Sequence, residues 1–199
     1  MKASAGFRRF LRGVVVVVIT LMLAGLTTSP ATADSGRTLA LGDSVMLGAR
    51  AALQNLGVQK VDAKVSRQAT TAPGLLRERG DGLQRRIVIH LGTNGIFSKQ
   101  ICRSIMKAVG PDRQVFLVNF KVPRRWEKPN NRAVDQCAAL HADQVTVVDW
   151  HLAASKHPGW LYSDGMHLRP SGARGFAKLI EAALRSNVSD PTFVATKPN

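Results

Sequence analysis

Short apolar runs, often rich in β-branched residues, alternate along this chain with stretches whose apolar residues have helical spacing. Ile87–Ile89 and Val115–Val118 are apolar throughout, which is typical of strands buried on both faces of a sheet. Strands that alternate with helices form a parallel sheet with helices on both of its faces. The sequence therefore predicts an α/β fold with a five-stranded parallel sheet, with strands over Thr38–Leu41, Val58–Val65, Ile87–Leu91, Val115–Phe120 and Val145–Val148.

Helices are predicted between these strands from the spacing of apolar residues. A weaker helical pattern is interrupted by Pro73-Gly74, and Gly110-Pro111 marks the end of another helix. The predicted helices span Val45–Leu56, Thr70–Arg79, Ile96–Val109, Asn131–Ala142 and Ser171–Arg185.

The N-terminal segment has the three parts of a secretory signal peptide. Residues 1–12 carry four cations and no acid, Val14–Leu26 is mostly apolar, and Ala31-Thr32-Ala33 is a small-x-small cleavage pattern. The apolar run is shorter than the roughly 20 residues that span a bilayer, although an uncleaved anchor is the alternative. We expect cleavage near Ala33, a catalytic domain over 34–186, a polar tail over 187–199, and a secreted or cell-wall-associated protein.

The chain is strongly basic, with a formal net charge of +15. Removal of residues 1–33 takes away four positive charges and no negative ones, which leaves +11. Such a surplus attracts polyanions, and outside a cell these are anionic cell-wall polymers and lipid head groups. Nucleic acid is not expected as a partner, because the export signal leads away from it and no nucleic-acid motif is present. The alternative is an ordinary solvated surface.

The tripeptide Gly42-Asp43-Ser44 follows the first predicted strand and begins a predicted helix. In parallel sheets of this kind, ligands bind beyond the carboxyl ends of the strands. Unpaired backbone N–H groups at a helix N-terminus favour developing negative charge, which suits a nucleophilic Ser44. A serine that merely caps the helix is the alternative.

Two further motifs supply the partners that a serine nucleophile needs. A serine hydroxyl requires a base, most often a histidine oriented by a carboxylate, and Asp164 and His167 lie three residues apart before the last predicted helix. Gly92-Thr93-Asn94-Gly95 follows the third strand, and the Asn94 amide can donate to an oxyanion. The alternatives are a turn with a surface histidine and a plain Asn-Gly turn.

These motifs resemble the sequence blocks of the SGNH hydrolases, from about Leu39 to Ala177. The resemblance implies a flavodoxin-like three-layer α/β/α sandwich. It also implies that Ser44 is the nucleophile, His167 the base and Asp164 its orienting carboxylate. Asn94 and the backbone N–H of Ser44 would be oxyanion donors. Ser66 stands where the second block has a glycine and is a further candidate donor, and Arg67 beside it either reaches the substrate or holds the loop.

A closer resemblance is to the extracytoplasmic SGNH domain of bacterial peptidoglycan O-acetyltransferases. It is carried by Gly42–Ala49, Val61–Val65 and Val122–Trp126 with Asn130-Asn131. In that group the domain follows a multi-span acyltransferase region, so the resemblance implies a partner membrane protein as acetyl donor, or else a simple esterase. Trp126 is a candidate sugar-ring platform, with loop packing as the alternative, and Asn131 is a second candidate for substrate binding.

Two cysteines, Cys102 and Cys137, lie in the part of the chain expected to be exported. Export favours one disulfide, and two buried free thiols are the alternative. Crossovers between parallel strands are right-handed. In the flavodoxin-like strand order 2-1-3-4-5, the helices that carry the two cysteines then lie on the same face of the sheet, next to each other.

The sequence predicts a secreted serine esterase that acts through an acyl-enzyme on an acetyl or other acyl ester of an extracellular carbohydrate or lipid. One alternative is an O-acetyltransferase that moves acetyl groups onto a cell-wall glycan. Another is a catalytically silent, basic binding module. No metal or other cofactor is expected, because the cysteines and histidines lack ligand spacing.

Overall fold

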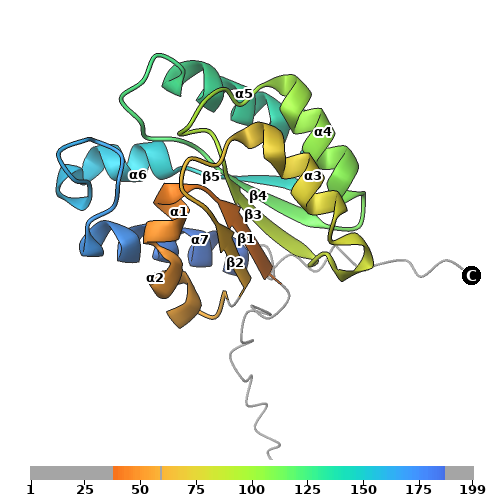
Figure 1. Ribbon diagram of the computed structural model, residues 1–199, viewed down its shortest axis with the longest axis horizontal. Coiled ribbons are helices and arrows are strands. Elements are labelled where there is room, and N and C mark those ends of the chain that lie inside the picture. Colours follow the sequence, from red (N-terminus) through yellow and green to blue (C-terminus); the bar gives the residue numbers. More distant parts are fainter. Residues whose placement is uncertain (1–37, 59, 187–199) are drawn as a thin grey trace, which may run out of the picture. The chain divides into compact units, whose positions relative to one another are not determined.

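A computed structural model describes residues 38–58 and 60–186 of the chain (Figure 1). At its centre is a five-stranded sheet in the order β2-β1-β3-β4-β5, in which every neighbouring pair is parallel. The predicted parallel sheet and its strand order are therefore confirmed. The expected signal peptide and C-terminal tail lie outside the described residues. The strands are β1 (Thr38–Gly42), β2 (Lys60–Ala63), β3 (Arg86–His90), β4 (Gln114–Val118) and β5 (Val145–Val148).

Helices cover both faces of the sheet, so the protein is the predicted three-layer sandwich (Figure 1). Alternate strand residues supply two cores, since Ile87 and Ile89 belong to one and Val88 to the other. The first core lies under α3 (Ala72–Arg77), α4 (Lys99–Val109) and α5 (Glu127–Leu140). The second lies under α1 (Ser44–Gly48), α2 (Arg50–Asn55), α6 (Trp150–Lys156) and α7 (Pro170–Ser186). Short 3-10 turns span Ala69–Thr71, Gly80–Gly82 and Pro158–Trp160.

Several element boundaries differ from the sequence prediction. The helix expected over Val45–Leu56 is divided into α1 and α2 at Ala49, directly after Gly48, a residue with low helix propensity. α4 begins at Lys99 because the Ser98 hydroxyl caps it by accepting from the Ile101 N–H group. α5 begins four residues earlier than expected, and α6 was not predicted at all.

No helix among the described residues is long and apolar enough to cross a membrane.

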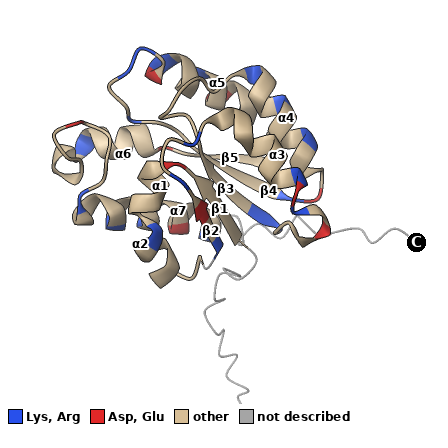
Figure 2. Ribbon diagram, in the orientation of Figure 1, with Lys and Arg blue, Asp and Glu red and all other residues tan. Residues whose placement is uncertain are grey.

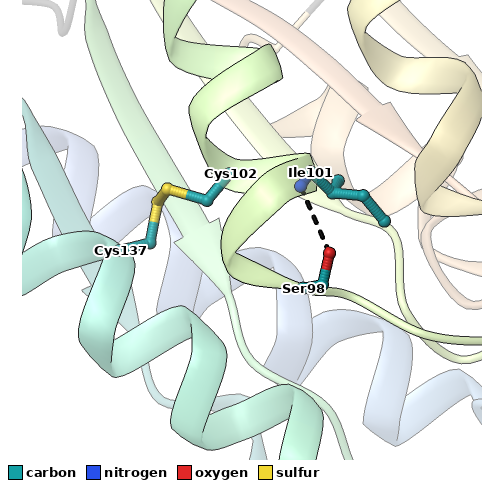
Figure 3. Close-up of a disulfide and its surroundings, with 4 residues drawn as sticks. All are labelled: Ser98, Ile101, Cys102 and Cys137. Carbon is teal, nitrogen blue, oxygen red and sulfur yellow. Dashed lines mark hydrogen bonds between the residues drawn. A yellow bond between two sulfur atoms is a disulfide. The ribbon is translucent and has the colours of Figure 1, made fainter.

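Cys102 and Cys137 face each other across the contact between α4 and α5 (Figure 3). The two helices lie side by side on the same face of the sheet, as the crossover argument predicted (Figure 1). The Cα atoms of the two cysteines are 6.0 Å apart, with the sulfur atoms at disulfide-bonding distance. Both side chains are buried in the first core. This placement agrees with the predicted pairing.

We predict that the exported protein contains the Cys102–Cys137 disulfide. The bond would close a loop between positions 35 residues apart, for which the chain-entropy model gives a stabilisation of roughly 3–4 kcal/mol. Mass spectrometry of a non-reduced digest should show the two peptides linked, and reduction should lower the melting temperature. Two freely alkylated thiols in protein recovered from outside the cell would refute the bond.

Candidate active site

Ser44 is the first residue of α1 and follows directly after β1. The sharp turn between strand and helix requires Gly42, because a Cβ atom at that position would lie 2.4 Å from Cβ of Met46. The buried Asp43 caps the helix, since its Oδ1 atom accepts a hydrogen bond of 3.0 Å from the N–H group of Val45. The capping alternative for Ser44 is therefore wrong: Asp43 is the cap.

The Ser44 hydroxyl faces His167, although 123 residues separate the two in the sequence. Oγ of Ser44 lies 3.1 Å from Nε2 of His167, and Nδ1 of His167 lies 2.6 Å from Oδ2 of Asp164. With the proton on Nδ1, the ring donates to Asp164 and its Nε2 atom can accept the proton of Ser44. These contacts form a continuous Ser–His–Asp relay.

A tight turn orients the carboxylate of Asp164 toward the histidine. Its Oδ1 atom accepts hydrogen bonds of 2.9 Å from the backbone N–H groups of both Met166 and His167. Gly165, at the centre of the turn, has a φ of +68°, which glycine adopts without the steric cost that a side chain brings. The backbone carbonyl of His167 accepts from the N–H group of Tyr162, which holds the far side of the turn.

The local hydrogen bonds keep Asp164 ionised. Desolvation raises its pKa, but the hydrogen bonds from the His167 ring and from the two backbone N–H groups outweigh this and lower the pKa from 3.8 to about 2. Because this value is below that of the unfolded chain, ionised Asp164 stabilises the fold above about pH 4, and the stabilisation is lost as the pH falls toward 2.

We therefore expect the side-chain carboxyl of Asp164 to titrate near pH 2, so that Asp164 itself causes no loss of activity between about pH 4 and neutrality. The measurement is the carboxyl carbon chemical shift of Asp164 as a function of pH. A midpoint near the model-peptide value of about 3.9 would contradict the relay geometry, because it would mean that His167 and the turn amides do not hold the carboxylate.

Asn94 lies in the loop after β3, next to the turn between β1 and α1 that leads into Ser44. The hydroxyl of Thr93 donates to Oδ2 of Asp43, so the two loops are tied together by a buried hydrogen bond. The amide nitrogen of Asn94 lies 3.2 Å from the Thr93 hydroxyl and 3.4 Å from the carbonyl oxygen of Arg67. Thr93 and Asp43 stood inside the sequence motifs, but the motifs alone gave neither of them this linking role.

Ser66 is the one non-glycine residue with a positive φ in the described part of the chain, at +59°. This left-handed conformation is the one that glycine adopts most readily, in keeping with the glycine of the second family block. The side chain is exposed, next to a surface hollow of about 480 Å³. The hollow is lined by Lys64, Val65, Ser66, Arg67, Gln68, Thr71 and Leu75.

Arg67 holds the loop after β2 and is not directed outward. Its guanidinium donates to the side chain of Asp62 at 2.7 Å, to the carbonyl of Asp62 at 2.6 Å and to the carbonyl of Gly42 at 3.3 Å. Desolvation raises the pKa of Asp62, but hydrogen bonds from Arg67 and Arg79 outweigh it and lower that pKa. The Arg67 side chain is 10% exposed. Of the two predicted roles, the structure favours loop holding over substrate contact.

The other two candidate substrate-binding residues are also engaged inside the protein. The Asn131 amide bonds to both the N–H and the C=O of Phe120, at 2.8 and 2.9 Å, and so fixes the loop between β4 and α5. Trp126 packs against the first core, with its indole N–H group buried. These contacts favour loop packing for Trp126 and a structural clamp for Asn131, and a role of either residue in substrate binding stays a prediction.

Within residues 38–58 and 60–186, no group of three or more His, Cys, Asp or Glu side chains is arranged to hold a metal ion.

The structure thus brings Ser44, His167 and Asp164 into one relay, with Asn94 on the neighbouring loop. A Ser–His–Asp relay at the carboxyl ends of a five-stranded parallel sheet defines a class of α/β serine hydrolases and acyltransferases. No family model matches the chain.

The chain is similar in sequence to two bacterial proteins. It is 40% identical over 162 residues to the "Putative peptidoglycan O-acetyltransferase YrhL" of Bacillus subtilis, and the alignment covers 77% of this chain and 25% of that protein. It is 28% identical over 156 residues to the O-acetyltransferase OatA of Staphylococcus aureus, and this alignment covers 76% of this chain and 26% of that protein. The chain thus spans about a quarter of the length of these relatives.

Solved structures agree with this relationship. The C-terminal catalytic domain of Streptococcus pneumoniae peptidoglycan O-acetyltransferase A superimposes with a TM-score of 0.64 at 26% identity, covering 77% of this chain and 95% of that domain. A family 3 carbohydrate esterase of Clostridium thermocellum has a TM-score of 0.61 at 13% identity, over 75% of this chain and 97% of the esterase, and shows the shared fold. The chain belongs to the SGNH hydrolase family of serine esterases and acyltransferases.

Proposed function

We propose that this protein is an O-acetyltransferase that moves acetyl groups through Ser44 onto a hydroxyl of a cell-wall glycan. The observation that carries the proposal is the 3.1 Å contact between Ser44 and His167, with Asp164 behind the histidine. Three of the similar proteins are named O-acetyltransferases, two of them with peptidoglycan in the name, and these names supply the substrate class. The sequence alone ranked hydrolysis first, and these relatives reverse that order, so hydrolysis becomes the second candidate.

The first half of the reaction forms an acyl-enzyme. His167 takes the proton of Ser44 as the serine oxygen bonds to the acyl carbon of the donor, and the carbonyl oxygen becomes negative. The Asn94 amide and the backbone N–H groups of Ser44 and Ser66 donate to this oxyanion. The bond to the donor oxygen then breaks, and His167 returns the proton to the leaving alcohol. Asp164 holds the imidazole in the required tautomer throughout.

The second half transfers the acyl group. A sugar hydroxyl gives its proton to His167 and its oxygen bonds to the acyl carbon, after which Ser44 leaves and recovers the proton. Water in place of the sugar gives hydrolysis. The side chains of His167 and Asp164 are 42% and 45% exposed, so the relay opens to solvent and a polymeric glycan can reach it. The hollow beside Ser66 gives such an acceptor room to bind.

The test supplies an aryl acetate as donor, with and without a glycan acceptor, and measures acetylated sugar and free acetate. We expect the acceptor to divert acetyl from water to sugar in the wild type and not in Ser44→Ala. Release of acetate alone, at a rate independent of the acceptor, would make the protein an esterase. No turnover under either condition would favour the binding module.

We also propose that the protein is exported, with cleavage near Ala33, a catalytic domain over 34–186 and a polar tail over 187–199. The acetyl donor would then be a membrane protein of the same cell. N-terminal sequencing of the protein recovered from the cell wall or medium should begin near Asp34. An intact Met1 end would instead support the uncleaved anchor.

One helix offers a surface for an anionic cell-wall polymer. The exposed residues Lys99, Arg103 and Lys107 are four residues apart on α4, so they share one face of a helix that contains no acid (Figure 2). We propose that this face holds the enzyme on its polymer by charge. Changing all three residues to Ser should weaken retention on an anionic polymer column at low salt, while turnover of an aryl acetate stays unchanged. Unchanged retention would leave an ordinary solvated surface.

A further inference from the structure

Asn130, on α5, is completely buried and uses every hydrogen of its side-chain amide on one loop. Its amide nitrogen donates to the carbonyl oxygens of Gly92 at 2.9 Å and Gly95 at 2.8 Å. Its Oδ1 atom accepts from the N–H group of Phe97 at 2.9 Å. Both donor hydrogens and the acceptor oxygen of this amide therefore have a partner on the same loop.

The loop that Asn130 holds, Gly92–Phe97, is the loop that carries Asn94. Its residues belong to no helix or strand. In the described part of the chain, no backbone-to-backbone hydrogen bond ties this loop to another loop or turn. Side chains therefore supply its polar anchors: the Thr93 hydroxyl bonds to Asp43, and Asn130 bonds to the backbone on both sides of Asn94.

Packing holds the two ends of this loop, because Phe97 at its far end is buried in the first core. Gly92 lies against the ring of Phe120, where a Cβ atom would come within 2.4 Å of a ring carbon, so the start of the loop is held by close contact. Gly95 has a φ of +146°, and a Cβ atom at this position would meet no other group within 4 Å. Its carbonyl accepts the hydrogen bond from Asn130 just after Asn94. Glycine has the greatest freedom to leave such a conformation.

We propose that Asn130 is a positioning residue, which fixes the loop so that the Asn94 amide is aimed at the oxygen that becomes negative in the transition state. The inference rests on the proposed function and deepens it. Oxyanion donors contribute to the rate when their direction is set before the reaction begins. Asn130 does this from a helix, α5, whose other end is held against α4 at Cys137 and Cys102.

Asn130→Ala should lower kcat on the order of 10–100-fold with little change in KM, because a misplacement of about 1 Å in a catalytic group can cost 10²-fold. Gln144→Ala is the matched control. The Gln144 amide also donates to two backbone carbonyls, those of Gly110 and Arg113, but it does so at the amino ends of β4 and β5, away from the carboxyl ends that carry the site. It should lower the melting temperature and leave kcat unchanged.

A double-mutant cycle separates positioning from a general structural role. If Asn130 acts through Asn94, Asn130→Ala should change kcat by less than about 2-fold in an Asn94→Ala background, because the donor that it aims is already absent. The Gln144→Ala change should combine additively with Asn94→Ala. A full, additive loss from Asn130→Ala in that background would overturn the inference, and so would a wild-type kcat in the single variant.

Two measurements keep the inference testable if Asn130→Ala does not fold. Asn130→Asp preserves the shape and the acceptor for Phe97 but loses both donors, and it should show the same fall in kcat. In the unaltered protein, the amide of Phe97 should exchange with solvent as slowly as the amides of β3. Rapid exchange would show that the clamp is absent and would overturn the inference without any variant.

Failure of the inference is distinguishable from failure of the proposed function. If Ser44→Ala retains full turnover, the proposed function is wrong, and the role of Asn130 falls with it. If turnover depends on Ser44 but Asn130→Ala is fully active, the positioning role alone is wrong.

Discussion

Ser44→Ala is expected to lower kcat on the order of 10⁶-fold, to the background of an ester assay, while the melting temperature stays near that of the wild type. The change removes the one oxygen that can bond to the acyl carbon, and His167 then has no serine proton to accept. The fold should survive because Asp43, and not Ser44, caps α1.

The matched control is Ser155→Ala. Ser155 is an exposed serine in α6 whose hydroxyl donates to the carbonyl of His151, and its loss should change neither turnover nor the melting temperature appreciably. Turnover by Ser44→Ala at more than a small fraction of the wild-type rate would mean that another group is the nucleophile. If Ser44→Ala lost its fold together with its turnover, loss of the nucleophile would not explain the lower kcat. Circular dichroism is therefore measured on the same samples.

Asn94→Ala is the second large effect, with kcat expected to fall on the order of 10²–10³-fold and KM to change little. An oxyanion donor acts mainly on the charge of the transition state, so its loss is felt in kcat and not in ground-state binding. Steady-state kinetics on an aryl acetate provide the measurement. If KM rises while kcat holds, Asn94 binds substrate and its proposed role is wrong.

The sequence predicted the sheet well because four of its five strands are largely apolar runs, whereas β2 (Lys60–Ala63) carries a Lys and an Asp. Gly42-Asp43-Ser44 and Gly92-Thr93-Asn94 follow β1 and β3, and the rule that ligands bind beyond the carboxyl ends of parallel strands brought them together. Asp164 and His167 could be paired with Ser44 because a serine nucleophile needs a base and the base needs a carboxylate. These inferences depend on local pattern and on chemistry.

What the sequence could not predict depends on side-chain partners that lie far apart in the chain. Asn130 bonds to Gly92 across 38 positions, and no spacing rule indicates such a clamp. Arg67 and Asn131 have the chemistry of substrate-binding residues, but Asp62 and the Phe120 backbone occupy their polar groups. α6 was missed because its seven residues are too few to establish a helical period.

The most direct test of the account is reaction of the purified protein with a serine-directed phosphonate, followed by mass spectrometry of the digest. We predict one phosphonyl group per molecule, on the oxygen of Ser44, with turnover lost in proportion to labelling and no labelling of Ser44→Ala. A phosphonyl group on any other residue, or full turnover by protein labelled completely at Ser44, would contradict the proposed nucleophile and the mechanism built on it.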